Sequence, residues 1–326
     1  MKQRDIEEDY KQIKKKVVTI DPRIKYMKRC LKTLNMTLPI LDKIYRKTIC
    51  LQDYHLGDGN CQGLAEACEY LDNKIVNRML FSNCGISGDQ LAVILEGIAK
   101  IKDFKALIYK YSALNTLAIE KLTALILKPI PNHLEQLSLV DNNMSPGTVE
   151  ILMDTLIENN SKLKKFELVG VHHSDYSFER VINYLEDGGY LKELDLSWSS
   201  VVPRVMLRLL KVVQNNRTLT NLSLSFNPLL EKQKELTIKE IAQGKTEVPL
   251  SQFNETVIEC FQDFIKYNTE LVHLNLEQTG LITAALKYIV ALLRRSQALR
   301  AIHLCGNVGL YHTDGSVNEE LLAWIK

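Results

Sequence analysis

This sequence lacks an excess of charge of either sign. Its 326 residues include 41 Lys and Arg against 39 Asp and Glu, which gives a formal net charge of +2. Chains that bind nucleic acid or an anionic membrane through their overall charge carry many more basic than acidic residues. We therefore expect no nucleic-acid partner on the grounds of composition.

Long apolar runs are also missing. The opening residues, MKQRDIEEDYKQIKKK, contain no apolar stretch typical of a signal peptide. Nowhere does the chain hold the roughly 18 consecutive apolar residues of a membrane-spanning helix. Seven cysteines, an odd number, fit reduced thiols better than a disulfide framework. Together these absences predict a cytoplasmic protein that does not cross a membrane.

The common catalytic motifs are absent as well. The sequence contains no G-x-x-x-x-G-K-[ST], no G-x-S-x-G and no H-E-x-x-H. His172 and His173 with Asp175 could be metal ligands, but no further cluster of ligand residues lies near them in the sequence. Cys61 and Cys68 fall on one apolar helix face, where packing explains them better than metal or redox chemistry. We therefore expect no enzymatic activity, no cofactor and no metal.

What the sequence does contain is one pattern that occurs nine times. In Leu219-x-x-Leu222-x-Leu224-x-x-Asn227, apolar and polar residues alternate as they do in a short strand with one buried face. Matching segments begin at Arg46, Val76, Phe104, Leu134, Leu163, Leu191, Leu219, Leu271 and Leu299. Successive starts lie 28 to 30 residues apart, except for one gap of 52. The fourth and sixth positions, which would point inward, are apolar in all nine segments.

A second pattern follows the strands. About fifteen residues after seven of the nine starts, apolar residues recur at i, i+3, i+4 and i+7, the spacing of one helix face. Thr123 is the single polar residue at these sites, although apolar residues make up only 46% of the chain. Each unit is thus predicted to be a strand, a turn, a helix and a return loop. Stacked units would bury faces that no unit can bury alone, forming a curved solenoid.

These residues resemble the leucine-rich repeat family, and the helix-bearing unit of about 28 residues is similar to its ribonuclease-inhibitor-like subclass. The resemblance covers about residues 46–326. It implies an α/β fold: a horseshoe-shaped arc with parallel strands on the concave face and helices on the convex face. Many intracellular proteins of this repeat type serve in cytoskeletal or ciliary complexes. The resemblance therefore implies a non-enzymatic scaffold or adaptor that binds another protein.

Two other functions stay open at the level of sequence. The fold also occurs in ribonuclease inhibitor and in the Ran GTPase-activating protein, so the chain could regulate an enzyme. Few cysteines and no strongly acidic concave face weaken the inhibitor resemblance, and the activator's acidic tail is missing. The second alternative is polyanion binding through the basic N-terminal region, which predicts a steep dependence on salt.

Residues 1–45 are expected to form a helical, basic cap over the first repeat. Asp21 and Pro22 are typical of a helix start, and the helix should extend to about Leu34. Its apolar residues on one side are Ile24, Met27, Cys30, Leu31 and Leu34. The basic residues of this region either dock an acidic tail or polyanion, or form a solvated surface.

The predicted solenoid of nine repeats, residues 46–326, departs twice from the regular period, both times in its C-terminal half. The long gap indicates an insertion at about residues 231–254, which is either a partner contact or a tolerated decoration. In the last repeat the helix face is displaced to Val317, Leu321 and Trp324. We expect this end to be uncapped and to be covered by a protein partner, a second copy or further chain.

The concave side is the predicted protein-binding surface. Strand positions three, five and seven face it, and the eighth position lies beside the strand ends. An exposed aliphatic row and aromatic residues there would supply interface anchors, although the rings could instead fold over the turns. The candidate residues are Leu80, Ile108, Val140 and Val169 in the row, Tyr111, Trp198 and Phe226 at the eighth position, and Glu277 in the polar C-terminal half. This mixture suits a protein better than a uniform phosphate backbone.

Overall fold

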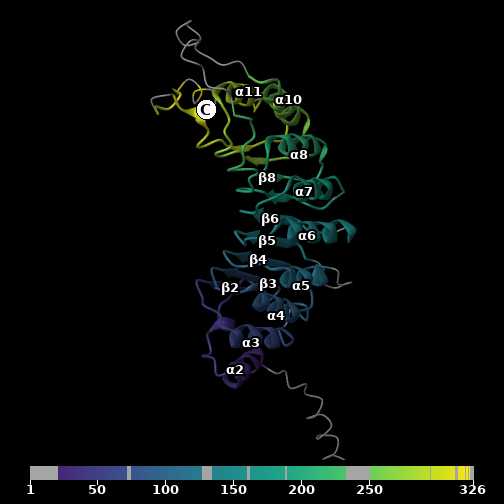
Figure 1. Ribbon diagram of the computed structural model, residues 1–326, viewed down its shortest axis with the longest axis vertical. Coiled ribbons are helices and arrows are strands. Elements are labelled where there is room, and N and C mark those ends of the chain that lie inside the picture. Colours follow the sequence, from purple (N-terminus) through teal and green to yellow (C-terminus); the bar gives the residue numbers. More distant parts are fainter. Residues whose placement is uncertain are drawn as a thin grey trace, which may run out of the picture.

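The computed structural model describes residues 21–71, 75–126, 134–159, 162–187, 189–232, 250–293, 295–312, 315–319, 321 and 323. Through these residues strands and helices alternate, and ten strands form one open sheet in chain order (Figure 1). Strands β2 to β10 are parallel, and β1 (Ile44–Tyr45) adds an antiparallel pairing at the N-terminal edge. The predicted α/β solenoid is confirmed.

The parallel strands have two lengths. Five residues form each of β2 (Thr48–Gln52), β3 (Arg78–Ser82), β4 (Ala106–Lys110), β5 (Gln136–Val140) and β6 (Lys165–Val169). Three residues form each of β7 (Glu193–Asp195), β8 (Asn221–Ser223), β9 (His273–Asn275) and β10 (Ala301–His303). In β7 and β9 the side chain of the last residue, Asp195 or Asn275, accepts the N–H two residues later at 2.9 Å. That N–H is diverted from the ladder, so the strand ends early.

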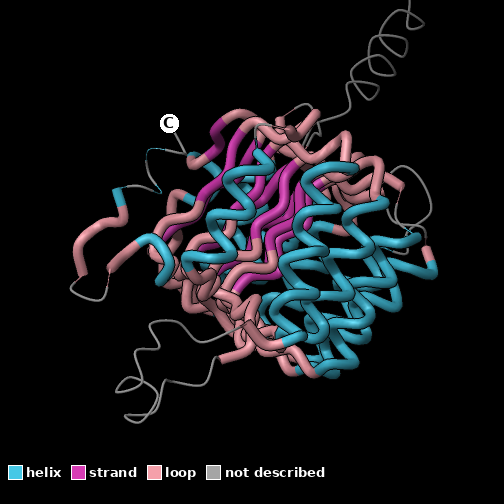
Figure 2. The backbone as a smooth tube through the Cα atoms, turned by 90° about the horizontal axis from the view of Figure 1, so that it is seen from above, coloured by secondary structure: helices cyan, strands magenta, loops and turns pink. Residues whose placement is uncertain are grey.

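The helices lie on the convex side of the arc and the strands on its inner side (Figures 1 and 2). They are α2 (Pro22–Lys32), α3 (Asp58–Cys68), α4 (Gly88–Ile98), α5 (Thr116–Ile126), α6 (Pro146–Glu158), α7 (Asp175–Asp187), α8 (Pro203–Asn215), α10 (Gln252–Tyr267) and α11 (Thr283–Leu293). The apolar helix faces predicted for the seven repeats are buried, except that Ile126 and Leu293 at two helix ends are half-buried. The spacing of apolar residues along these helices therefore predicts correctly which side chains are buried.

The predicted strand register is confirmed by the ladder. Leu137 lies beside Phe166, which lies beside Leu194, and Leu194 lies beside Leu222. All four of these fourth-position side chains are buried. A row of equivalent side chains thus runs along the buried face of the sheet, and each repeat covers the apolar core of the one before it.

The N-terminal helix α2 covers the first repeat, but not with the predicted face. The helix ends at Lys32, two residues before the expected end at about Leu34. It buries Cys30, as predicted, together with Tyr26, whereas Ile24, Met27, Leu31 and Leu34 of the predicted face are exposed. The reason lies in α3, whose contacting surface is small and polar. A side chain at Gly63 would meet the Tyr26 ring at 2.9 Å, so only a glycine lets the tyrosine approach.

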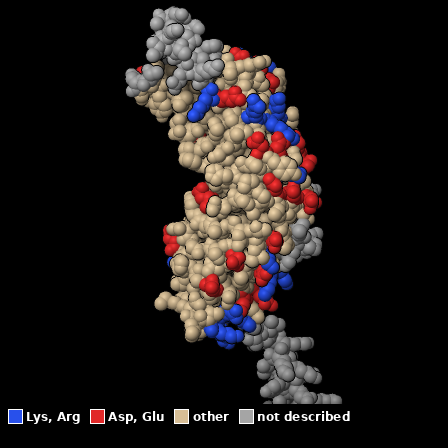
Figure 3. Space-filling view, viewed as in Figure 1, with Lys and Arg blue, Asp and Glu red and all other residues tan. Residues whose placement is uncertain are grey.

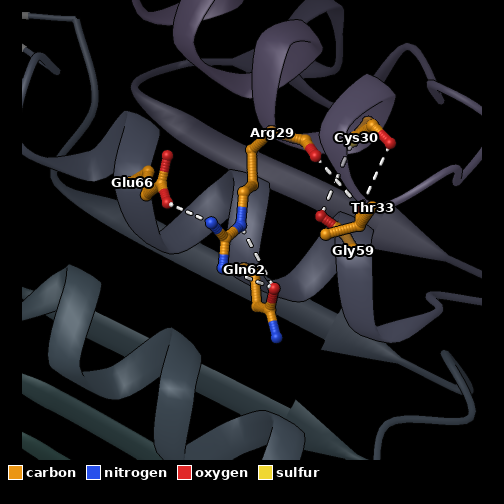
Figure 4. A network of polar contacts seen from close by, with 6 residues as sticks. All are labelled: Arg29, Cys30, Thr33, Gly59, Gln62 and Glu66. Carbon is orange, nitrogen blue, oxygen red and sulfur yellow. Dashed lines mark hydrogen bonds and ion pairs between the residues drawn. The ribbon is translucent and has the colours of Figure 1, made fainter.

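Polar contacts complete the junction between α2 and α3 (Figure 4). The Tyr26 hydroxyl donates to Asn60 Oδ1 at 2.5 Å and accepts from the backbone N–H of Leu38 at 3.1 Å. Arg29 donates to Gln62 Oε1 at 2.8 Å and pairs with Glu66 at 3.4 Å. The cap is therefore fixed on the first repeat by buried and half-buried hydrogen bonds.

Two predictions for the C-terminal part have different outcomes. The helix that resumes the period after the insertion is confirmed as α10, whereas most of the insertion, 231–254, lies outside the described residues at 233–249. The displaced helix was wrongly predicted to include Val317, which instead forms an isolated antiparallel bridge with Tyr311. Asn318 Oδ1 accepts the N–H of Leu321 at 3.1 Å, as a helix N-cap does, so Val317 precedes the helical residues. Leu321 is buried, and Trp324 lies outside the described residues.

Acidic and basic side chains are interspersed along the helix side of the face shown in Figure 3 and do not form one patch of a single sign. This distribution agrees with the near balance of charges in the sequence. Among the described residues, no helix has the length and apolar character needed to cross a membrane.

Candidate functional site

One backbone feature is common to all nine repeats: the residue at the eighth position is left-handed. These residues are Asp53, Asn83, Tyr111, Asp141, Gly170, Trp198, Phe226, Gln278 and Gly306. The cause is the continuing hydrogen-bond ladder between repeats. Beyond the strands, the N–H of Trp198 donates to the carbonyl of Ser225 at 3.0 Å, and that of Phe226 donates to the carbonyl of Glu277 at 2.9 Å. The turn that makes these bonds requires a positive φ.

Three of these left-handed positions are occupied by large aromatic residues. Glycine, asparagine and aspartate adopt this conformation readily, but for other residues it costs about 1–2 kcal/mol. Tyr111, Trp198 and Phe226 have φ of 54°, 58° and 59°. Backbone strain of this kind concentrates at functional sites, so an aromatic side chain there points to a role outside folding.

Trp198 and Phe226 form a stacked pair on neighbouring repeats. Their ring centroids lie 3.8 Å apart and the ring planes are 13° from parallel. Trp198 is 56% exposed, while Phe226 is half-buried. The sequence left open whether these rings turn outward or fold over the turns, and the structure places Trp198 outward. We call these two residues the aromatic pair; Tyr111, which is also exposed, lies three repeats away.

The predicted aliphatic row divides into two side-by-side pairs. Leu80 lies beside Ile108, and Val140 lies beside Val169. Leu80, Ile108 and Val169 are partly exposed, but Val140 is buried, with 7% of its surface accessible. The expectation that Val140 is exposed was wrong, because Lys110 and Val169 flank it on both neighbouring strands.

A polar hollow of about 230 Å³ lies on the strand side between β6 and β9. The polar residues that line it are Lys165, Glu167, Glu193, Asp195, Asn221, Ser223, His273 and Asn275. Lys165 Nζ lies 3.1 Å from carboxylate oxygens of both Glu167 and Glu193. Although desolvation opposes the charged amine, these two carboxylates raise the pKa of Lys165. Its positive charge is thus held between the two acids.

Hydroxyl groups connect the hollow to the aromatic pair. Asp195 Oδ1 accepts the Ser197 hydroxyl at 2.5 Å, and Ser197 Oγ lies 2.8 Å from both Ser223 Oγ and Ser225 Oγ. Ser197 and Ser225 are buried and directly precede Trp198 and Phe226 in the chain. This network fixes the backbone from which both rings project.

Glu277, the acidic candidate, lies on the repeat that follows Phe226. Its Oε1 is 3.8 Å from Nδ1 of His303, whose ring contacts that of His273 at a centroid distance of 4.8 Å. The Phe226 N–H donates to the Glu277 carbonyl, so this acid follows the aromatic pair along the array. The structure therefore brings Trp198, Phe226 and Glu277 into three successive repeats. Tyr111 and the aliphatic pairs belong to earlier ones.

Reactive or metal-binding groups do not gather in the described part of the chain. No group of three or more His, Cys, Asp and Glu there could hold a metal ion. Burial raises the pKa of the Cys61 and Cys68 thiols to about 12, so both stay protonated and unreactive at neutral pH. His173 is half-buried and packs edge-on against the buried Phe178 at a centroid distance of 5.2 Å.

Sequence reasoning placed six of the residues that line the polar hollow on the polar half of the strand side, but it missed Lys165, Glu167 and the hollow itself. The six are Glu193, Asp195, Asn221, Ser223, His273 and Asn275. Asp195 and Asn275 at the fifth strand position carry a signal that could have been used, because both favour a turn in which the side chain binds the N–H two residues later. Their recurrence marks where the strands shorten.

The comparisons with known proteins add no relative: no family model matches the chain, and no curated protein matches its sequence.

Proposed function

We propose that this chain is a leucine-rich repeat protein of the ribonuclease-inhibitor-like subclass and a non-enzymatic scaffold that binds another protein on its strand side. The repeat length of 28 to 30 residues and the continuous parallel sheet support the family. The proposed setting is a cytoplasmic assembly of the cytoskeletal or ciliary kind. The type of repeat supports this setting.

The aromatic pair carries the proposal. Trp198 keeps more than half of its surface exposed although it sits on strained backbone and could be replaced by a residue that suits the turn. Aromatic side chains bury large areas on binding at low entropic cost, which makes tryptophan and tyrosine frequent interface anchors. The serine network beneath the pair holds it in place before binding, so little order has to be gained.

The polar hollow next to the pair supplies specificity. Its carboxylates, its lysine and its serine hydroxyls offer both donors and acceptors, in the way that a protein–protein interface combines apolar anchors with hydrogen bonds. A phosphate backbone would require a surface dominated by Lys and Arg. The strand side offers Lys165 between two acids instead.

Affinity capture from the native source with a substituted pair tests this proposal. A partner bound through the pair should be retained by the unaltered chain and lost with Trp198→Asn combined with Phe226→Asn. Asparagine is chosen because it tolerates the left-handed backbone. Tyr288→Asn is the matched control, because Tyr288 is an exposed aromatic residue on the helix side. Equal retention by all three proteins would remove the aromatic pair from the interface.

Regulation of an enzyme is separated from passive binding by an activity assay. Candidate small GTPases are incubated with the chain and their rate of GTP hydrolysis is followed. A scaffold leaves that rate unchanged. Stimulation that is lost with the double asparagine variant would replace the scaffold proposal with a regulatory one.

A further inference from the structure

Helix α2 lies at the N-terminal end of the arc (Figure 1), and its outward face is a second apolar surface. Ile24, Met27 and Leu31 recur at intervals of three and four residues, so they form one stripe along the helix. They are 48 to 66% exposed. We propose that this stripe, which we call the cap stripe, docks an amphipathic helix of a partner protein that carries acidic residues beside its apolar face.

The cap stripe belongs to a helix that is already anchored. Its inner face is held against α3 by the buried Tyr26 and Cys30 and by the contacts of Arg29 that Figure 4 shows. The stripe residues therefore do not serve the contact with the first repeat. Eleven residues span about 16 Å, or three turns, which is the length over which helices dock through residues at i, i+3 or i+4, and i+7.

The end of α2 extends the exposed apolar surface at a cost to folding. The N–H of Asn35 donates to the carbonyl of Cys30 at 2.9 Å, and that of Leu34 donates to the carbonyl of Leu31 at 3.1 Å. This pair of bonds is a Schellman motif, in which glycine is preferred at the left-handed residue. Here that residue is Leu34, with φ of 55° and 95% of its surface exposed. Neither the turn nor the core accounts for a leucine in that place.

Charge determines which occupant fits the cap stripe. Lys28 and Lys32 lie beside it four residues apart, whereas the Lys25 ammonium lies over the Tyr70 ring at 4.8 Å, and α2 contains no acidic residue. A second copy would place these lysines against one another, and like charges at such spacing repel. A partner helix with glutamate or aspartate next to its apolar residues would instead meet the lysines with opposite charge. A bare polyanion would leave the apolar side chains unused.

The probe for this inference is a synthetic helical peptide of three heptads with leucine at positions a and d and glutamate at positions e and g. Its binding to the full chain is measured by fluorescence anisotropy at low and at physiological salt. Met27→Asn combined with Leu31→Asn should weaken binding at least tenfold. The matched control, Ile151→Asn, changes an exposed apolar residue on α6 and should leave binding unchanged.

A charge swap tests the second half of the inference. The variant that combines Lys28→Glu with Lys32→Glu should bind the acidic peptide at least tenfold more weakly than the unaltered chain does. It should instead bind a peptide in which lysine replaces each glutamate. Binding of neither peptide by the unaltered chain would overturn the inference. Acidic-peptide binding that survives the asparagine changes would indicate a polyanion site instead.

Two other occupants give results of their own. A dimer in sedimentation that dissociates with Leu31→Asn would assign the stripe to a second copy. Peptide binding that appears only after removal of residues 1–20 would assign it to the chain's own N-terminal segment. Either result overturns the partner helix. None of these outcomes depends on the aromatic pair, which lies on other repeats.

Discussion

Asn227 reaches from its own turn to the repeat before it and donates to the carbonyl of Leu196 at 2.8 Å. The same amide nitrogen donates to the carbonyl of Leu224 at 3.1 Å, and Oδ1 accepts the N–H of Ser199 at 3.0 Å. One fully buried side chain thus serves backbone groups of two repeats. Asn307 does the same for Leu276 and Leu304 at 2.7 and 2.8 Å.

Replacement of this asparagine should therefore destabilise the array strongly. Asn227→Ala leaves several buried backbone groups without partners, at about 1–3 kcal/mol for each group that water cannot reach. We expect the free energy of unfolding in urea to fall by about 2–4 kcal/mol. Asn215→Ala, at an exposed site on α8, should change it by less than about 0.5 kcal/mol. A similar small change at Asn227 would show that its hydrogen bonds are replaceable.

Leu196 and Trp198 should separate folding from binding. Leu196→Ala empties a fully buried site and should cost about 2–5 kcal/mol. Trp198→Asn loses a ring stack worth about 1 kcal/mol but relieves left-handed strain of similar size, so stability should stay within about 1 kcal/mol. Thermal or urea unfolding of the two variants measures the difference. Equal losses would place the Trp198 ring in the core.

Gly97→Ala should destabilise the protein, although alanine normally favours a helix. A side chain at Gly97 in α4 would lie 2.4 Å from Cα and 2.6 Å from the carbonyl oxygen of Ala65 in α3. The two helices would have to separate, which we expect to cost about 1–3 kcal/mol. Gly147 in α6 has no atom within 4 Å of such a side chain, so Gly147→Ala should instead stabilise by about 0.5–1 kcal/mol. Opposite signs in urea unfolding would verify the close approach.

His173 should make stability depend on pH. Burial first, and the neighbouring His172 second, lower the pKa of His173 from 6.5 to about 4. The unfolded chain takes up the proton first as pH falls, so stability is full above about pH 6.5 and declines as pH falls toward 4. The loss amounts to up to about 3 kcal/mol.

The measurement is urea unfolding of the unaltered chain and of His173→Phe between pH 7.5 and pH 4. The variant keeps the edge-on contact with Phe178 and removes the titrating group. It should lose less stability with acid than the unaltered chain does. His312→Gln, at an exposed histidine, should retain the full dependence. Parallel curves for the unaltered chain and His173→Phe would mean that the pKa of His173 does not differ between the folded and unfolded states.

The repeat and its register could be predicted from the sequence because burial imposes a phase on apolar residues. Leu194 and Leu222 are found where that phase puts them, side by side on parallel strands. The same rule cannot choose between two apolar faces of one helix. In α2 the choice depends on Gly63, which is distant in sequence and admits Tyr26, so the exposure of Met27 and Leu31 could not be foreseen.

The candidate site was predictable in position but not in arrangement. The eighth position marks Trp198 and Phe226 as neighbours, yet their stacking depends on a left-handed backbone that the sequence pattern does not reveal, since neither residue favours it. Val140 shows the opposite failure. Alternation puts it on the strand side, and only the side chains of the adjacent strands decide that it is covered.

The change of strand length at β7 has a mechanical consequence. Each repeat is joined to the next by ladder hydrogen bonds, and the backbone N–H groups diverted to Asp195 and Asn275 remove bonds from the β7 and β9 repeats. If the two ends of the molecule are pulled apart, it should lengthen in steps as single repeats open. The weakly fastened repeats should yield first, and the half next to the cap should hold to the last.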